Sequence, residues 1–173
     1  LEDSSLRVFS GMSAEGEKVI CMLVDAHYPM KNGKTSSAIV AAAPMANLEE
    51  VLTLDEEDIL MYSFIIRADG TYVVRNRQEG NYFNYIRQNF STYNGKTAEG
   101  YVEELSAAMH QNAAYSTMFQ ENGENKYLLC TDLTNSEWFL ISVMPYGTLD
   151  KILEDLSDER QLITLIMAFF ILA

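Results

Sequence analysis

The segment SFIIRADGTYVVRN, residues 63–76, decides the fold because it contains two strands and the turn that joins them. β-Branched and aromatic residues dominate Ile59–Arg67 and Thr71–Arg75, as is typical of strands. Asp69 and Gly70 separate the two runs, and an Asp-Gly pair favours a tight hairpin turn. We therefore expect an antiparallel strand pair here.

Two helices and three further strands are predicted after this hairpin. Residues 84–90 and 97–111 are helical in pattern, and Thr97 can cap the second helix. Strands are expected at 114–120, 126–132 and 138–144, with Asn122-Gly123 as a hairpin turn between the first two. Hairpins followed by helices and more hairpins predict an α+β fold, a five-stranded antiparallel sheet with helices on one face.

The first part of the chain is predicted to form three strands of a second, similar sheet that lacks its opening hairpin and helices. Strands are predicted at 6–9, 19–24 and 37–43, joined by glycine-containing turns. Asn47, with Glu50 three residues later, indicates the N-cap of a short linking helix. The acidic stretch 55–58 is interpreted as a solvated connection.

The C-terminal residues indicate a helix that enters a membrane. Residues 148–161 are charged and helical in pattern, and LITLIMAFFILA at 162–173 has no charge. A spanning helix needs about 20 apolar residues, so the alternative for a run of this length is a buried core helix. Because the apolar run is still unbroken at Ala173, we favour the start of a transmembrane helix. The predicted organisation is a partial distal module (1–54), a proximal module (55–146), a juxtamembrane helix (147–161) and a membrane entry (162–173).

Composition argues against several classes of function. The formal net charge is −13, with 25 acidic and 12 Lys or Arg residues, and such a surface repels nucleic acid. Two cysteines, Cys21 and Cys130, are read as buried thiols, although a disulfide outside the cytoplasm stays open.

No motif predicts catalysis, a cofactor or a metal. Asn-Gly-Lys-Thr occurs at 32–35 and 94–97, but Tyr28 and Phe90 stand where a phosphate loop needs its first glycine. His27 and His110 lack ligands at metal-binding spacing, and no nucleophile elbow is present. We therefore expect no enzyme activity in this chain, no cofactor and no metal.

The segments SFIIRADGTYVVRN and YLLCTDLTNSEWFLISVMPYGTLDKIL resemble the membrane-proximal half of a double-Cache sensor domain. SAIVAAAPMANLEEVL is similar to the last strand and linking helix of the distal half. Cache modules are PAS-like extracellular domains of bacterial chemoreceptors, histidine kinases and diguanylate cyclases. The resemblance implies a PAS-like sheet outside the cell or in the periplasm, a transmembrane receptor and a small-molecule ligand. The distal amino-acid-binding motif of some members is missing.

Aromatic and polar residues of the second module are the candidate ligand site. Pockets are mostly apolar and aromatic with a few orienting polar groups, and Arg75 could clamp a carboxylate while Asp132 accepts from an amine. The alternative is that the aromatic residues fill an ordinary core. The candidate residues are Tyr62, Phe64, Arg75, Tyr101, Tyr115, Tyr127, Asp132 and Trp138.

The leading hypothesis is therefore a ligand-sensing ectodomain, with an amino or organic acid as ligand and a homodimer that signals through the C-terminal helix. The alternative is a ligand-free structural or dimerisation ectodomain, since Leu149, Ile152 and Leu156 form a stripe suited to helix pairing. A membrane-anchored hydrolase would need a convergent acid, base and nucleophile, and the sequence indicates none.

Overall fold

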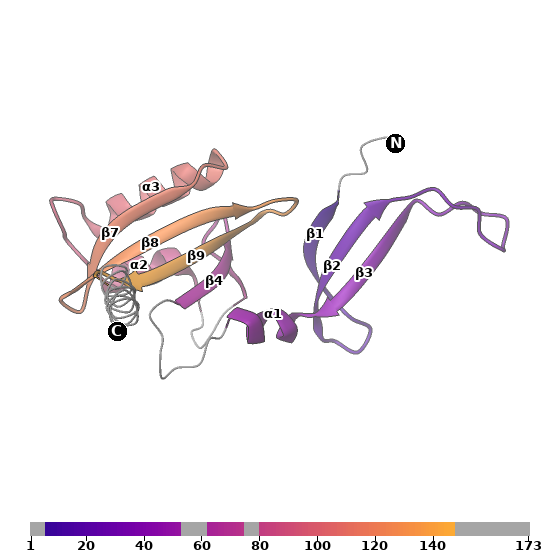
Figure 1. Ribbon diagram of the computed structural model, residues 1–173, viewed down its shortest axis with the longest axis horizontal. Helices are drawn as coiled ribbons and strands as arrows, with labels where there is room; N and C mark the ends of the chain where they lie inside the picture. The colour runs from indigo at the N-terminus through magenta and orange to yellow at the C-terminus, as the bar shows by residue number, and fades with distance from the viewer. Residues whose placement is uncertain (1–5, 53–61, 75–79, 148–173) are drawn as a thin grey trace, which may run out of the picture.

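The computed structural model describes residues 6–52, 62–74 and 80–147, which form two antiparallel sheets joined by a short helix (Figure 1). The α+β class predicted from the sequence is confirmed. The predicted strand 59–67 is described from Tyr62 onward. The predicted juxtamembrane helix and membrane entry at 147–173 lie outside the described residues, apart from Gly147. Within the described residues, no helix has the length and apolar character needed to span a bilayer.

The first sheet consists of β1 (Arg7–Met12), β2 (Lys18–Asp25) and β3 (Ala38–Pro44), in that order. Its first hairpin closes where Gly16 adopts φ +83°, a backbone conformation that glycine tolerates without strain. Between β2 and β3, the first Asn-Gly-Lys-Thr segment is a turn, in which Asn32 accepts a hydrogen bond from the Lys34 amide at 3.0 Å. The three predicted strands are therefore confirmed.

Helix α1 (Met45–Leu52) begins directly after β3. The predicted N-cap at Asn47 is wrong, because the helix starts two residues earlier and Asn47 lies inside it. Apolar residues at helical spacing turn one side of α1 toward the core of the six-stranded sheet. They are Met45, Leu48 and Leu52, and the burial of Met45 explains why the helix already includes this residue.

The second sheet has six strands in the order β5-β4-β9-β8-β7-β6. The prediction of five strands is wrong by one, the short strand β6. Phe90 and Ser91 follow α2 in extended conformation and pair with Glu121 and Gln120. The strands are β4 (Tyr62–Arg67), β5 (Tyr72–Val74), β6 (Phe90–Ser91), β7 (Tyr115–Glu121), β8 (Glu124–Leu133) and β9 (Trp138–Pro145).

The Asp-Gly hairpin predicted at 69–70 joins β4 to β5. Gly70 has φ +81°, and the Asp69 carboxylate accepts a hydrogen bond from the Thr71 amide at 2.9 Å. This bond is the main reason that the pKa of Asp69 is lowered. The Asn81 side-chain amide donates to the Asp69 carbonyl at 2.7 Å, so the turn is tied to the start of the next helix.

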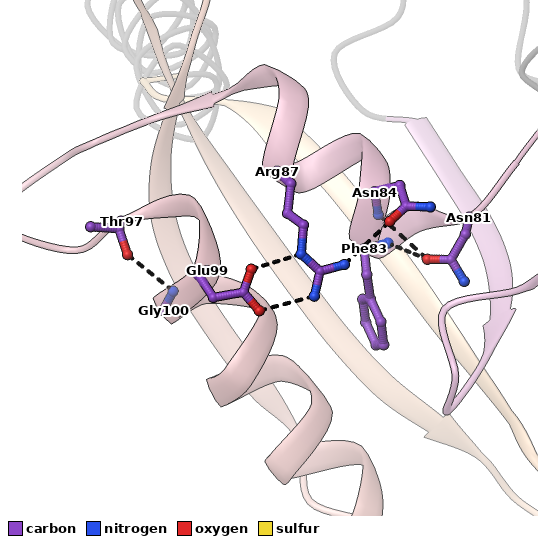
Figure 2. Close-up of polar contacts among 7 residues, drawn as sticks. All are labelled: Asn81, Phe83, Asn84, Arg87, Thr97, Glu99 and Gly100. Atoms are coloured by element: carbon purple, nitrogen blue, oxygen red, sulfur yellow. Dashed lines mark hydrogen bonds and ion pairs between the residues drawn. The ribbon is translucent and has the colours of Figure 1, made fainter.

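Helices α2 (Tyr82–Asn89) and α3 (Ala98–His110) cover one face of this sheet. Asn81 caps α2 by accepting from the Phe83 and Asn84 amides, and Thr97 caps α3 as predicted. Figure 2 shows both caps and the contact between the helices, where Arg87 donates to both Glu99 carboxylate oxygens at 2.7 and 2.9 Å. This forked pair fixes α2 against α3 on the outer surface.

Strands β5, β4 and β9 are covered on both faces, whereas β8 exposes the face that points away from the helices. One core lies under α2 and α3 and includes Ile66, Ile86, Leu105, Phe119 and Ile141. A second core on the opposite face contains Met45, Ile65, Val73, Val74 and Trp138. Successive strand residues point to opposite faces, so β4 and β9 contribute side chains to both cores.

Candidate functional site

Five aromatic rings form a continuous group on the helix side of the six-stranded sheet. Phe64 lies at its centre, with ring centroids 4.7 Å from Tyr82, 5.4 Å from Tyr72 and 6.2 Å from Tyr62. Tyr85 stacks on Tyr82 at 6.1 Å and ends the group. These distances are those of packed aromatic pairs, so the group is part of the core at Phe64 and Tyr82 and reaches the surface at Tyr62, which is 38% exposed.

Glu121 is a buried carboxylate beside this aromatic group. Its side chain is only 4% exposed, and it accepts hydrogen bonds from the Tyr85 hydroxyl and from Lys126 Nζ, the latter at 2.7 Å. The Lys126 side chain is itself 17% exposed. Because a buried charge is costly unless it is paired, this arrangement satisfies Glu121 with one cation and one hydroxyl.

Besides burial, the negative charge of Glu121 contributes to the raised pKa values of the tyrosines Tyr62 and Tyr82 beside it. Burial is the main cause that raises the pKa of Tyr62, and the Glu121 charge adds to it. The pKa of Tyr82 is raised mainly by burial, then by its neighbours Tyr62 and Tyr72, and after them by Glu121. Both hydroxyls therefore stay protonated at neutral pH and can donate hydrogen bonds.

A second polar cluster lies on the helix side of the sheet, between α3 and β7. Lys96 Nζ pairs with Glu104 at 2.6 Å, and the Tyr115 hydroxyl donates to the same carboxylate at 2.9 Å. Tyr101 is buried, with its hydroxyl donating to the Met118 carbonyl at 3.0 Å and the Lys96 ammonium 5.0 Å from its ring centroid. These contacts hold α3 to β7.

The structure brings together only part of the candidate site predicted from the sequence. Tyr62, Phe64, Tyr101 and Tyr115 all belong to the helix side, either in its core or packed against it. Arg75 lies outside the described residues. Asp132 is exposed, and its charge reaches the buried Cys130, whose pKa is raised to about 12 mainly by burial.

Two candidate residues lie on the opposite face of the sheet. Tyr127 alternates with the buried Leu128, is 38% exposed and contacts Tyr146 with ring centroids 5.6 Å apart. Trp138 is 5% exposed and belongs to the core shared with α1. Neither side chain can share one pocket with the aromatic group around Phe64.

The sequence analysis did not single out Glu121, Lys126 or Tyr85. A usable signal was present, because Asn122-Gly123 fixes the β7–β8 register and Glu121 pairs with Glu124. In that register Glu121 and Lys126 share a face with Phe119 and Leu128, which places two charges on a buried side.

Within the described ranges, no group of three or more His, Cys, Asp or Glu side chains is arranged to hold a metal ion. His27 and His110 are both exposed, and His110 Nδ1 lies 2.7 Å from the Ser106 carbonyl oxygen. The two cysteines are free thiols, with Cys130 fully buried.

Solved structures with a similar fold include the extracellular domains of two proteins. The chain is similar to the extracellular domain of mmHK1S-Z2, described as a histidine kinase, with a TM-score of 0.52, 10% identity, and coverage of 83% of this chain and 52% of that one. It is similar to the corresponding domain of mmHK1S-Z3, also described as a histidine kinase, with a TM-score of 0.52, 13% identity, and coverage of 88% and 53%. The chain therefore spans about half the length of these domains.

At this identity the likeness concerns the fold alone. The chain has the fold of these extracellular sensor domains, and the resemblance to Cache-type modules is confirmed at that level. No protein-family profile matches the sequence, and a search of curated proteins gives no match.

Proposed function

We propose that this chain is the extracytoplasmic sensing part of a bacterial membrane receptor and that it binds a small molecule on the helix side of its six-stranded sheet. The observation that carries the proposal is the polar set of Tyr85, Glu121 and Lys126 at the edge of the aromatic group. Ligand sites combine aromatic walls with a few placed polar groups, and the helix side offers both.

The charges of this set define the class of ligand. An ammonium group can replace Lys126 on the Glu121 carboxylate, and a carboxylate can pair with the Lys126 ammonium that is released. Only the two exchanges together keep both buried charges paired once the Glu121–Lys126 pair is opened. An amino acid, which carries both groups, therefore fits best, whereas an organic acid that takes Lys126 would need another cation beside Glu121. The half-exposed Tyr62 lies at the proposed point of entry. Arg75 stays a further carboxylate partner predicted from the sequence.

The first sheet is proposed to be part of a second, membrane-distal module. Its strands expose large apolar side chains, which an isolated domain rarely leaves uncovered. These are Phe9, Met12, Met22, Ile39 and Val40. In the proposed organisation, residues 1–54 belong to that module, 55–146 form the proximal one, and the segment from 147 carries the signal as a helix into the membrane of a homodimer. Catalysis, if the receptor has any, resides in another part of it.

Thermal unfolding of the full 173-residue chain in a mild detergent tests the ligand proposal. A ligand at 100 times its dissociation constant stabilises by about 2.7 kcal/mol, which raises Tm by roughly 5–10 °C for a chain of this size. We expect a shift of this kind from at least one member of a panel of amino acids and organic acids. Glu121→Gln should remove it, while Leu129→Ala, an exposed position on the opposite face, should not.

Two outcomes would count against the proposal. The absence of any stabilising compound would favour the alternative of a structural, ligand-free ectodomain. A ligand whose shift survives in Glu121→Gln would place binding away from the aromatic group.

A further inference from the structure

The start of β9 is packed against the first sheet. Trp138 lies in the core on the face opposite α2 and α3, together with Met45 at the start of α1. Val8 of β1 and Ile20 of β2 pack against the same core. Two sheets that are far apart in most of Figure 1 therefore share one hydrophobic contact, which we call the Trp138 seat.

Polar contacts hold β1 in the same place. The Val8 amide donates to the Asn135 carbonyl in the β8–β9 turn at 2.7 Å. Arg67 Nη2 donates to the Ser10 hydroxyl at 2.9 Å, and Arg67 is the cross-strand partner of Trp138. β1 is an edge strand, so its outward amide needs a partner outside its own sheet, and Asn135 supplies one.

β9 connects the Trp138 seat to the other end of the six-stranded sheet. It pairs with β4 from Tyr62 to Arg67 and with β8 from Lys126 to Leu133. A strand paired on both sides cannot move alone, so a displacement at Trp138 also strains the pairing of β9 with β4 and β8 toward Pro145. β9 therefore begins in the core shared with the first sheet and ends at Pro145, directly before residues 146 and 147.

We infer that the Trp138 seat is a coupling point, through which a change in the three-stranded sheet is passed to β9 and onward along the chain. Ile20 and Val8 pack against the core that contains Trp138, and the backbone of Trp138 is paired with β4 and β8 on either side. A rearrangement of the first sheet must therefore either move Trp138 or break the seat. This inference does not depend on ligand binding at Glu121.

The seat contains its own reporter, because Trp138 is the only tryptophan among the 173 residues. The full chain in a mild detergent is compared with Ile20→Ala, which removes a side chain that packs on the seat. The matched control is Leu23→Ala, a partly buried residue of the same strand whose side chain points to the opposite face. Tryptophan emission and amide hydrogen exchange of residues 138–145 are measured for all three.

Coupling predicts that Ile20→Ala shifts Trp138 emission to longer wavelength and speeds amide exchange in β9 and at Val8 by about tenfold or more. Leu23→Ala should leave the emission and the β9 exchange close to those of the unaltered chain. Equal emission and equal β9 exchange in all three proteins would overturn the inference.

A urea titration of the unaltered chain keeps the test decisive if a variant does not fold. Coupling predicts that Trp138 emission and the protection of residues 18–25 are lost together. Loss of protection in the first sheet at lower urea, with Trp138 emission unchanged, would show that the two sheets respond independently and would refute the coupling. Because no ligand is used, this failure is distinct from a failed ligand screen.

Discussion

Replacing Gly70 with alanine should destabilise the protein far more than its place in a hairpin turn suggests. Gly70 has φ +81°, and a Cβ atom there would lie 2.7 Å from Asn81 Oδ1 and 2.8 Å from Phe83 Cγ. Neither neighbour can retreat freely, because Asn81 Oδ1 accepts the Phe83 amide at 2.9 Å and the Phe83 ring is buried. The clash therefore falls on the cap of α2.

The magnitude follows from two costs. A residue with a Cβ pays about 1–2 kcal/mol for a left-handed backbone conformation. Overpacking against fixed neighbours adds about 1–3 kcal/mol. Gly70→Ala should therefore lower the free energy of unfolding by about 2–5 kcal/mol.

Gly95 supplies the matched control, because it also has φ +81° but no atom lies within 4 Å of the position its Cβ would take. Gly95→Ala should show the backbone cost alone, and the difference between the two variants should be about 1–3 kcal/mol. Urea denaturation followed by circular dichroism measures both. A difference below about 0.5 kcal/mol, the size of an ordinary surface effect, would refute the steric reasoning.

Three further outcomes are expected. Lys126→Met should lower the free energy of unfolding by about 3 kcal/mol or more, because it leaves Glu121 buried without its cation, and adding Glu121→Gln should restore part of the loss in the same denaturation assay. Cys130 should react with iodoacetamide at pH 8 only when the protein unfolds, since burial raises its pKa to about 12. Peptide-resolved mass spectrometry should find Cys130 unlabelled in the native chain. Rapid labelling of the native chain would contradict the burial of this thiol. Thr97→Ala should cost about 1 kcal/mol by removing the side-chain oxygen that accepts from the Gly100 amide, whereas Thr97→Ser should cost a few tenths, and equal losses would argue against capping.

Local signals in the sequence were sufficient for most of the secondary structure. Asn122 and Gly123 have φ of +52° and +83°, the pair of conformations that an Asn-Gly hairpin turn requires, and Thr97 caps α3 as its type and position indicate. The short strand β6 was not predictable in this way. Two residues carry no periodicity, and Phe90 becomes extended because it pairs with Glu121 and stacks on Phe119 at 3.8 Å.

The candidate site was harder to predict because the central strand β9 is buried on both faces. In β9 the sequence WFLISVM shows no alternation of polar and apolar residues, so nothing local tells which side chains face α2 and α3. Trp138 was therefore grouped with Phe64, although the two lie in different cores. Glu121 was passed over for the opposite reason, since an acidic residue beside an Asn-Gly turn is usually solvated.

The same absence of alternation shows why β9 is suited to combine two inputs. Phe139, Ile141 and Val143 lie in the core under α2 and α3, whereas Trp138 and Leu140 contact the core shared with α1 and the first sheet. Under the proposed function, a ligand that separates Lys126 from Glu121 would reach β9, because Lys126 is the cross-strand partner of Pro145 at the end of that strand. A rearrangement of the first sheet acts on the second core through Trp138. Both proposed inputs would therefore converge on one central strand, and each could shift its position only by the difference between its own interaction free energies with the two positions.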